Sequence, residues 1–413
     1  MTDDLMKSSG SGDADNSTHA DEQRLYPKVR FRGFDEPWKK VKARQLFISK
    51  SKKNYPALPV LSASQELGMI YRSNLDSDIK TERSGLKNYK LIEPGDFVIH
   101  LRSFQGGFAY SDKRGIASPA YTVFTFKDKT NHDDYFWKEK FQTYNFIQLL
   151  KQVTYGIRDG KSISYSDFST LKLTYTSKKE QVQISKCLKQ INSLLSLQQR
   201  KLELEKALEK SLFQNLYTDF PNIFPKLAFE KSPWHAIKLQ DAFTEISKRS
   251  KAGQLLTVSI SKGIFPFNES ERKNNSSSDK SKYKVVKIND IAYNTMRMWQ
   301  GAEAVSRYDG IVSPAYTVIR AKKNQNPFFY AFMFKREKYL YLFQTYSQGL
   351  TSDTWNLKYP LFKEIKAMIP ENLYIQDKIA NILNTRLKHT ELENTKLETF
   401  QALKQFLLQN LFI

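Results

Sequence analysis

The chain has 413 residues and carries 65 Lys and Arg against 43 Asp and Glu, a formal net charge of +22. Its length allows two or three domains of roughly 150 residues, and 28 Phe with 22 Tyr exclude a wholly disordered chain. The single cysteine, Cys187, excludes a disulfide framework or a multi-cysteine metal site, and no apolar run reaches the roughly 18 residues that span a bilayer. The polar N-terminus lacks the apolar core of a signal peptide, so we expect a soluble cytoplasmic protein with no membrane partner.

The charge is distributed unevenly along the chain. Residues 1–25 carry six acids and two bases, a net of −4, so the remaining 388 residues carry +26. We expect the 1–25 segment to be a disordered acidic tail. A body this basic is typical of proteins that bind nucleic acid, and the alternative is a generally basic surface without such a partner.

The remainder of the chain is a tandem duplication with a period of about 195 residues, far longer than the repeats of solenoid proteins. Residues 115–123 (GIASPAYTV) return as residues 310–318 (GIVSPAYTV) with one difference in nine. So many matches in one order exclude chance and predict two homologous domains. The other matched pairs are residues 27–31 and 225–229, Trp38 and Trp234, Tyr89-Lys90 and Tyr283-Lys284, Asp96 and Asp290, residues 141–144 and 343–346 (FQTY in both), and the endings 213–217 and 408–412.

The first part of each half predicts a β-rich domain. Residues 97–101 and 121–126, with their counterparts around Ile291 and Val318, are rich in β-branched and aromatic side chains, and clusters of turn-forming residues separate them. A long helical stretch follows in each half. We therefore predict an α+β fold with β-rich domains at residues 26–176 and 218–372, a central helix at 177–217 and a C-terminal helix at 373–413.

Both helical stretches lack Gly and Pro and space their apolar residues near 3.5, the repeat of a coiled coil. At 1.5 Å per residue, roughly 38 residues form a rod of about 55 Å, whose narrow apolar stripe needs a partner. We predict that the helices pair with each other as an antiparallel coiled coil with pseudo-twofold symmetry; the alternative is that each packs only on its own domain. Polar residues that interrupt the frame would fix its register, namely Gln198, Glu205, Glu209, Arg386, Thr390, Glu393 and Lys404. The predicted seam consists of Ile184, Leu188, Ile191, Leu195, Leu202, Leu212, Leu216, Ile379, Leu383, Leu397, Phe400, Leu407 and Leu411.

The sequence carries no complete catalytic signature. It has no G-x4-G-K-[ST] phosphate loop, no G-x-S-x-G elbow and no H-E-x-x-H pair, and its five His have no duplicate in the other half. Residues 118–121 and 313–316 (SPAY in both) resemble the loop with which amino-group DNA methyltransferases hold a flipped adenine, but Ala replaces its second Pro and no Gly-rich cofactor loop occurs. We interpret SPAY as a turn that leads into a strand, and we expect no catalytic residue, metal site or cofactor in this chain.

A domain that reads DNA needs cations for phosphates and side chains that form hydrogen bonds to base edges. Such residues gather where the two halves diverge most, roughly at 50–88 and 248–282, while the framework elements match. This pattern favours two homologous scaffolds with different recognition surfaces; the alternative is unconstrained surface. The DNA-binding candidates are Lys52, Lys53, Arg72, Arg83, Lys87, Arg102, Lys113, Arg114, Arg249, Lys251, Lys262, Arg272, Lys273, Arg297 and Arg307. Further residues of these types are Lys50, Gln105, Lys248, Lys280 and Lys282.

These features together resemble the specificity (S) subunit of type I restriction–modification systems. The openings PKVRF with Trp38 and PKLAF with Trp234 resemble the start of that family's target recognition domains, and residues 197–202 (LQQRKL) with the L-x-Q-N-L-[YF] endings resemble its helical regions. The resemblance spans about residues 26–413. The second copy departs from the pattern at residues 391–397 (ELENTKL), which lack the Gln-Gln-Arg, and at Ala228 in place of Arg30.

The resemblance implies a bacterial defence protein that catalyses nothing itself. Each target recognition domain would read one half of an asymmetric bipartite site in double-stranded DNA, and the paired helices would set the spacer. The helices would also dock two methyltransferase (M) subunits, and restriction (R) subunits would join them. S-adenosylmethionine, ATP and Mg²⁺ would bind in those partners, for adenine N6 methylation and ATP-dependent DNA cleavage. The sequence leaves two alternatives open, a fused methyltransferase or nuclease that uses the SPAY loops and an RNA-binding adaptor.

Overall fold

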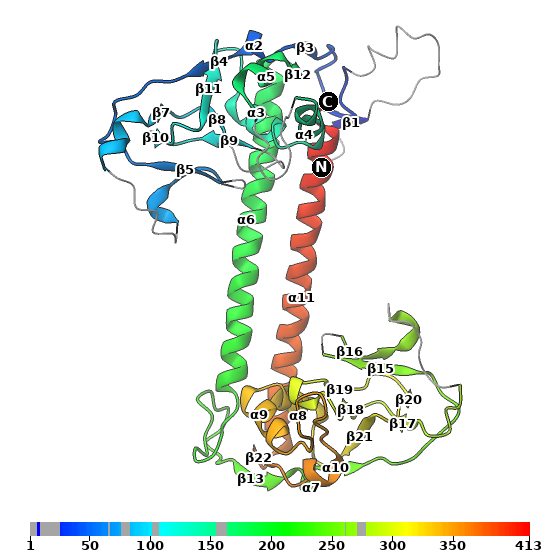
Figure 1. Ribbon diagram of the computed structural model, residues 1–413. Helices are drawn as coiled ribbons and strands as arrows, with labels where there is room; N and C mark the ends of the chain where they lie inside the picture. The colour runs from blue at the N-terminus through cyan, green and yellow to red at the C-terminus, as the bar shows by residue number, and fades with distance from the viewer. Residues whose placement is uncertain are drawn as a thin grey trace, which may run out of the picture. The chain divides into compact units, whose positions relative to one another are not determined.

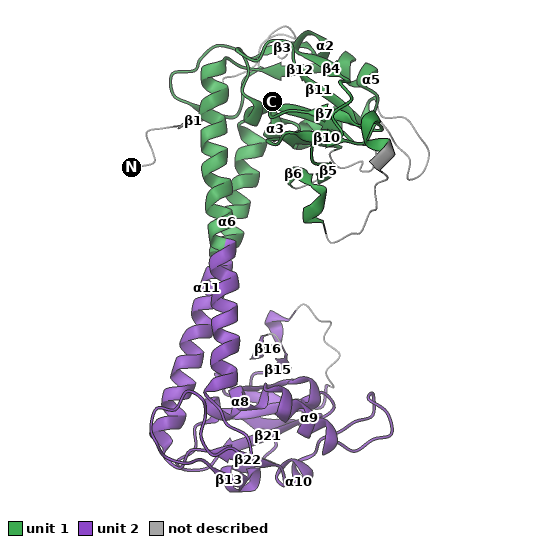
Figure 2. Ribbon diagram, turned by 90° about the vertical axis from the view of Figure 1, so that its left-hand side faces the viewer, with its two compact units in different colours: residues 1–198, 396–413 green, residues 199–395 purple. Residues whose placement is uncertain are grey.

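The computed structural model describes residues 6–8, 25–64, 67–75, 83–100, 107–153, 163–260, 262–270 and 278–413. The chain divides into two compact units: unit 1 comprises Met1–Gln198 with Lys396–Ile413, and unit 2 comprises Gln199–Thr395 (Figure 2). Two 38-residue helices, α6 (Lys178–Asn215) and α11 (Leu373–Asn410), are each divided between the units (Figure 1). The units therefore cut across both helices, whereas the sequence-based division kept each helix as a separate segment.

Unit 1 is built on a four-stranded antiparallel sheet in the order β4-β11-β8-β9. Its second strand, β11, has the sequence TVFTF, and such β-branched and aromatic side chains favour a strand that is buried along most of its length. Two-stranded sheets accompany it, pairing β5 with β6, β7 with β10, β3 with β12 and β1 with β2. The strands are β1 (Met6–Ser8), β2 (Val29–Phe31), β3 (Lys39–Lys42), β4 (Phe47–Lys50), β5 (Leu61–Ser64), β6 (Gly68–Tyr71), β7 (Lys90–Ile92), β8 (Asp96–Ile99), β9 (Phe108–Ser111), β10 (Gly115–Ala117), β11 (Thr122–Phe126) and β12 (Lys172–Tyr175), and the short helices are α2 (Ala43–Leu46), η1 (Arg72–Asn74), η2 (Arg83–Asn88), α3 (Asp134–Lys140), α4 (Tyr144–Lys151) and α5 (Tyr165–Thr170).

Unit 2 repeats this topology apart from the β1-β2 pair, with a main sheet in the order β14-β21-β18-β19 and two-stranded sheets β15-β16, β17-β20 and β13-β22 among the described residues. Both units mix helices with antiparallel sheets, which confirms the predicted α+β fold with two tandem β-rich domains. The strands are β13 (His235–Lys238), β14 (Phe243–Glu245), β15 (Leu256–Ser259), β16 (Gly263–Pro266), β17 (Lys284–Val286), β18 (Asp290–Asn294), β19 (Glu303–Val305), β20 (Gly310–Val312), β21 (Tyr316–Ala321) and β22 (Lys366–Ile369), and the short helices are α7 (Leu239–Ala242), η3 (Phe267–Glu269), η4 (Met298–Gln300), α8 (Pro327–Phe334), α9 (Glu337–Thr345) and α10 (Tyr359–Phe362).

An aromatic core joins the main sheet of each unit to its helices. Phe47 of β4 is fully buried and packs edge-on against Phe124 and Trp137, with ring centroids 5.4 and 5.2 Å apart. Phe243 takes the same place in unit 2, 4.8 Å from Tyr330. Each buried ring contributes roughly 1.5–3 kcal/mol, and each edge-to-face pair about 0.5–1.5 kcal/mol more. This packing fixes the sheet and therefore the loops that leave its strands.

One of the repeated motifs does not mark equivalent positions. Residues 115–123 and 310–318 do correspond, since they lead from β10 into β11 and from β20 into β21. Helix α3 corresponds to α8, because the N–H of each N-cap residue, Asp133 or Asn326, donates to a glutamine of the following long helix, Gln181 (2.9 Å) or Gln376 (3.0 Å). The first FQTY then links α3 to α4, while the second lies at the end of α9. Equating these two segments as a repeat was wrong.

The two long helices lie side by side within each unit (Figures 1 and 2). In unit 1, the start of α6 shares a buried cluster with the end of α11, and in unit 2 the end of α6 shares one with the start of α11. Their directions are therefore opposite. No helix in the described part of the chain combines the length and the apolar character needed to cross a membrane. Of the predicted seam residues, Ile184, Leu188, Leu202, Leu216, Ile379, Leu383, Leu407 and Leu411 are buried, and Ile191, Leu195, Leu212, Leu397 and Phe400 are half-buried.

Polar residues that interrupt the apolar frame bond across the helix pair of unit 2. Arg386 donates to Glu205 (2.7 Å), and the Thr390 hydroxyl donates to Glu209 (3.0 Å). Lys201 also pairs with the buried Glu393 (3.1 Å). These bonds can all form in only one axial alignment of the helices, so they favour a single register.

Candidate nucleic-acid interface

A basic cluster forms in unit 1 where the loop after β4 runs along β7. The Leu91 N–H donates to the Lys52 carbonyl (2.7 Å), and the Asn54 N–H donates to the Lys87 carbonyl (3.1 Å). Burial, and after it the charge of Lys53, lowers the pKa of Lys90, so charges of the loop act on the strand beside it. Basic cluster 1 consists of Lys52, Lys53, Lys87 and Lys90.

The same position of unit 2 carries a second basic cluster. The Val285 N–H donates to the Lys248 carbonyl (2.9 Å), as Leu91 does to Lys52, and Arg249 forms a backbone bridge with Lys284. The ammonium group of Lys280 lies 5.0 Å from the ring centroid of Tyr283. The two clusters therefore occupy equivalent places on equivalent strands but differ in their residues. Basic cluster 2 consists of Lys248, Arg249, Lys251, Lys280, Lys282 and Lys284.

The charges of basic cluster 1 are available to an external anion. Among the described residues, no carboxylate lies within 4 Å of an ammonium group of this cluster, and Lys52, Lys53 and Lys87 are exposed. The ammonium of the half-buried Lys90 donates to the Tyr121 carbonyl (2.6 Å), so the three exposed lysines carry the available charge. Lysines in such a setting bind the phosphates of a nucleic acid and fix its position, whereas sequence is read by other contacts to the bases. The clusters are therefore candidates for phosphate contact rather than for base readout.

Arg72, Lys113 and Arg114 lie in other segments of unit 1 than basic cluster 1. Arg72 Nε donates to Ser62 Oγ (3.1 Å) beside the β5-β6 hairpin, and Lys113 pairs with the adjacent Asp112 (2.5 Å). Arg114 is exposed directly before β10. Arg83 begins η2, but its side chain lies outside the described residues, as do Arg102 and Gln105 altogether.

The remaining candidates of unit 2 occupy separate loops. Lys262 lies in the turn between β15 and β16, with its ammonium 5.7 Å from the ring centroid of Phe265. Arg297 precedes η4 and donates to Gln300 (3.2 Å), and Arg307 is exposed between β19 and β20. Arg272 and Lys273 lie outside the described residues. The structure therefore brings together Lys52, Lys53 and Lys87 in one unit and Arg249 and Lys251 in the other.

Sequence reasoning misses two members of the clusters, Lys90 and Lys284. Both follow a tyrosine in the repeated Tyr-Lys pair, so a cation duplicated within the framework was the available signal. Lys284 is paired with Glu245 at 3.7 Å. Lys50 is neutralised more fully, because it is mostly buried and pairs with two carboxylates, Glu93 and Asp96, 2.8 Å from each. Its charge is neutralised within unit 1 and stabilises the sheet.

The SPAY segments form turns. The Tyr121 N–H donates to the Ser118 carbonyl (3.1 Å), and the Tyr316 N–H donates to the Ser313 carbonyl (3.0 Å). Each turn ends where β11 or β21 begins, which confirms the interpretation of SPAY as a turn leading into a strand. In the described part of the chain, no three His, Cys, Asp or Glu side chains gather as the ligands of a metal would.

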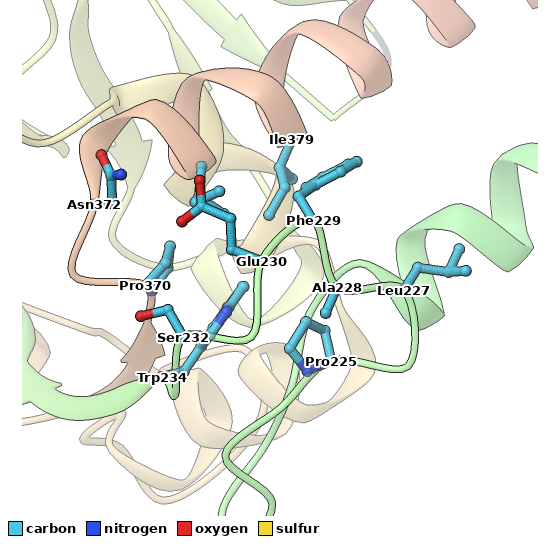
Figure 3. Close-up of a pocket in the computed structure, with 11 residues that line it drawn as sticks. Pro225, Leu227, Ala228, Phe229, Glu230, Ser232, Trp234, Pro370, Asn372 and Ile379 are labelled. Carbon is cyan, nitrogen blue, oxygen red and sulfur yellow. The ribbon is translucent and has the colours of Figure 1, made fainter.

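An apolar pocket of unit 2 lies where the chain after α6 meets the start of α11 (Figure 3). Its cavity of about 10 Å³ has room for roughly one water, too little for a cofactor. The equivalent place in unit 1 holds an ion pair between Arg30 and Glu180 (2.8 Å), and Ala228 with Ile375 replaces that pair in unit 2. The pocket is therefore a consequence of packing and not a ligand site.

Two homologous domains, each with a basic cluster at the same place, are typical of a tandem nucleic-acid-binding protein. The sequence pattern of the family described as "Type I restriction modification DNA specificity domain" matches residues 36–206 and again residues 231–401. Because these matches cover most of the chain, the protein belongs to that family and carries two of its domains in tandem. It is thus a DNA-recognition subunit of the type I restriction–modification class.

One solved structure of an S subunit shares this fold, and two further structures resemble the chain more distantly. An S subunit of a type I restriction–modification system from M. genitalium is 15% identical, with a TM-score of 0.58 over 94% of this chain and 99% of that one. The HsdS subunit from Thermoanaerobacter tengcongensis is 11% identical over 92% and 98% of the two chains, with a TM-score of 0.47. A chain from a type I R-M system, solved to explain complex assembly and conformational transition, is 11% identical over 91% and 98%, with a TM-score of 0.48. No curated protein sequence matches the chain.

Proposed function

We propose that each unit reads one half of an asymmetric bipartite site in double-stranded DNA. The observation that carries this proposal is the equivalent placement of the two basic clusters on one scaffold, combined with their different residues. Equivalent placement lets both units contact the phosphate backbone in the same way. Different loops around each cluster let the two units select different bases.

The paired helices set the distance between the half-sites. Each helix has 38 residues, and at 1.5 Å per residue its length is about 57 Å. Two reading heads on one face of a duplex must be separated by about one helical turn, roughly 34 Å, or a multiple of it. Helices of this length, cross-linked by the polar pairs of unit 2, support a fixed spacer.

The helix pair also docks the methyltransferase subunits. In unit 1, Leu194 and Leu197 of α6 and Leu403 and Phe406 of α11 are exposed, Leu197 to 65% and Phe406 to 51%. Each of the four residues comes directly before a residue of the apolar heptad frame that pairs the two helices. In an antiparallel helix pair, the residues at these preceding positions lie on the same face of the pair. An apolar stripe of this kind on a helix pair supports docking of another helix.

The chain itself supplies recognition and no chemistry. The methyltransferase subunits bind S-adenosylmethionine and methylate adenine N6, and the restriction subunits use ATP and Mg²⁺ for cleavage. The turn geometry of both SPAY segments, with Ala in place of the second Pro, supports this division. Titration of the isolated chain with S-adenosylmethionine in a calorimeter is expected to give no binding heat, and tight binding would contradict it.

Methylome sequencing of cells with and without this gene tests the proposal as a whole. We expect one asymmetric bipartite N6-methyladenine motif that is present with the gene and lost without it. A continuous motif, or a methylome that does not change, would count against recognition of one half-site by each unit.

A further inference from the structure

A groove of about 560 Å³ lies in unit 2 between the end of α6 and the turn from α8 to α9. Lys206 and Lys210, one helical turn apart, line it from α6, and Lys335 and Lys338 line it from the turn. Phe213 adds an apolar surface between the two walls. The groove is therefore basic on both sides.

Part of this charge is held in a fixed place. Arg336 donates to both carboxylate oxygens of Asp219 (3.0 and 2.7 Å), and the Lys338 ammonium lies 3.2 Å from the same carboxylate. Among the described residues, no carboxylate lies within 4 Å of the ammonium groups of the other three lysines. Within that part of the chain, the groove thus combines a preformed wall with three cations that lack a counterion.

The homologous place in unit 1 lacks these cations. Leu202 of α6 corresponds to Leu397 of α11, and Asn326 at the start of α8 corresponds to Asp133 at the start of α3. On this alignment, the four lysines Lys206, Lys210, Lys335 and Lys338 correspond to Gln401, Gln405, Gln142 and Asn145. Amides of similar size replace all four cations, so the scaffold does not require the charges.

We propose that this groove binds an acidic segment of a partner polypeptide and gives unit 2 a docking site that unit 1 lacks. Glu209 and Glu337 also line the groove and interrupt its cations, so it suits the separated carboxylates of a peptide better than the continuous charge of a phosphate backbone. Phe220, next to Asp219, is 76% exposed and offers apolar surface that a peptide side chain can cover. In Figure 1 the end of α6 and α9 lie on one side of unit 2, whereas β17 with basic cluster 2 lies on the other. A polypeptide therefore fits the groove better than nucleic acid does.

The inference rests on the proposed function, in which the partner is the methyltransferase subunit. Two methyltransferase copies that use the same apolar face of the helices would bind with equal affinity. The groove makes them unequal, because only the copy beside unit 2 gains an electrostatic contribution. That contribution weakens as salt rises.

Four substitutions in the full chain give unit 2 the residues of unit 1 at the groove: Lys206→Gln, Lys210→Gln, Lys335→Gln and Lys338→Asn. A matched control neutralises four exposed lysines of unit 2 outside the groove, Lys322, Lys323, Lys358 and Lys366, each to Gln. Binding of the methyltransferase subunit is measured by sedimentation velocity at 100 and 500 mM NaCl. We expect the wild type and the control to bind the first copy roughly tenfold more tightly than the second at low salt, and the groove variant to bind both alike.

Each outcome separates the inference from the proposed function. Equal binding by the wild type and the groove variant at both salt concentrations would overturn the groove proposal and leave the proposed function intact. No binding of the methyltransferase subunit to any of the chains would contradict the proposed function itself. A larger loss of duplex DNA affinity in the groove variant than in the control would assign the groove to nucleic acid and overturn the proposal. Circular dichroism checks that both variants are folded.

Discussion

Replacement of Lys50 by Ile is expected to leave a buried charge without its partner in unit 1. Asp96 is fully buried at the start of β8, and Lys50 pairs with it from β4 at 2.8 Å. The equivalent Asp290 of unit 2 receives its cation from the adjacent strand β21, since Arg320 donates to it at 2.7 and 2.9 Å, whereas β11 lies between β4 and β8 in unit 1. Ile246 stands in unit 2 where unit 1 has Lys50, so an isoleucine fits the space.

The magnitude follows from burial. Removal of one partner from a buried ion pair costs about 3–5 kcal/mol, because the remaining charge is neither solvated nor paired. The loss of the second pair, between Lys50 and the partly exposed Glu93, adds at most about 1 kcal/mol. A second substitution, Thr125→Arg, should restore a cation beside Asp96. Phe124 of β11 pairs with Phe97 of β8, so the next residue, Thr125, lies opposite Asp96, as Arg320 lies opposite Asp290 in unit 2. We expect the free energy of unfolding of the double variant to lie within about 1.5 kcal/mol of the wild type.

Hydrogen exchange in a urea series measures this locally, through the amides of β8 and β11. The amides of β18 and β21 in unit 2 serve as the internal control and should not change. The reasoning would be refuted if Lys50→Ile lowered the free energy of unfolding by less than about 1 kcal/mol, or if Thr125→Arg gave no recovery.

Three further predictions concern pH, DNA affinity and the spacer. Burial raises the pKa of Glu303 to about 8, so between pH 4.5 and 8 the unfolded chain has released this proton while the folded chain keeps it. The free energy of unfolding of unit 2 should therefore fall by up to about 1.4 kcal/mol per pH unit over this range, as measured by urea titrations. Glu303→Gln should remove this pH dependence, and an unchanged dependence in the variant would contradict the prediction. Replacement of Lys52, Lys53 and Lys87 by Gln should weaken the salt dependence of duplex DNA binding, measured by fluorescence anisotropy. The slope of log affinity against log salt concentration should become smaller by about 0.9 for each phosphate that these lysines neutralise in the wild type. A slope equal to that of the wild type would show that basic cluster 1 does not contact DNA. One extra heptad in both α6 and α11 adds about 10.5 Å, so methylome sequencing should show a spacer about three base pairs longer with the same half-sites, and altered half-site bases would contradict a ruler.

The sequence predicts the duplication and the fold well because both depend on patterns that survive divergence. The apolar frame from Ile184 to Leu216 continues over many helical turns, and residues 115–123 and 310–318 place the same turn before the same strand. The FQTY match fails for a physical reason. Both copies supply an aromatic ring to the core, but Phe141 does so at the end of α3 and Phe343 does so from α9. A short motif can therefore recur without marking the same position.

The interface is predicted less completely, because charge alone does not distinguish a free cation from a paired one. Lys50 and Lys52 are two residues apart in the sequence, yet Lys50 is neutralised by two carboxylates and Lys52 is exposed. The difference arises because Lys50 is the last residue of β4 and is held against Asp96 in the sheet, whereas Lys52 lies in the loop beyond the strand. Lys90 is missed for the converse reason, since it lies within a short strand among apolar neighbours. Register, and not composition, decides which cations reach a ligand.

The residue differences between equivalent positions of the two units distinguish the scaffold from its recognition surfaces. Inside the units, charged residues change together: Arg30 with Glu180 gives way to Ala228 with Ile375, and the cation beside the buried aspartate moves from β4 to β21. A buried ion pair that loses one partner costs a large part of the unit's stability, so at these two places the changes occur together. On the surface, the cations of the two basic clusters differ without compensation, because an exposed lysine costs little to gain or lose. One scaffold can therefore carry two unlike DNA-reading surfaces, which is the property that an asymmetric bipartite target requires.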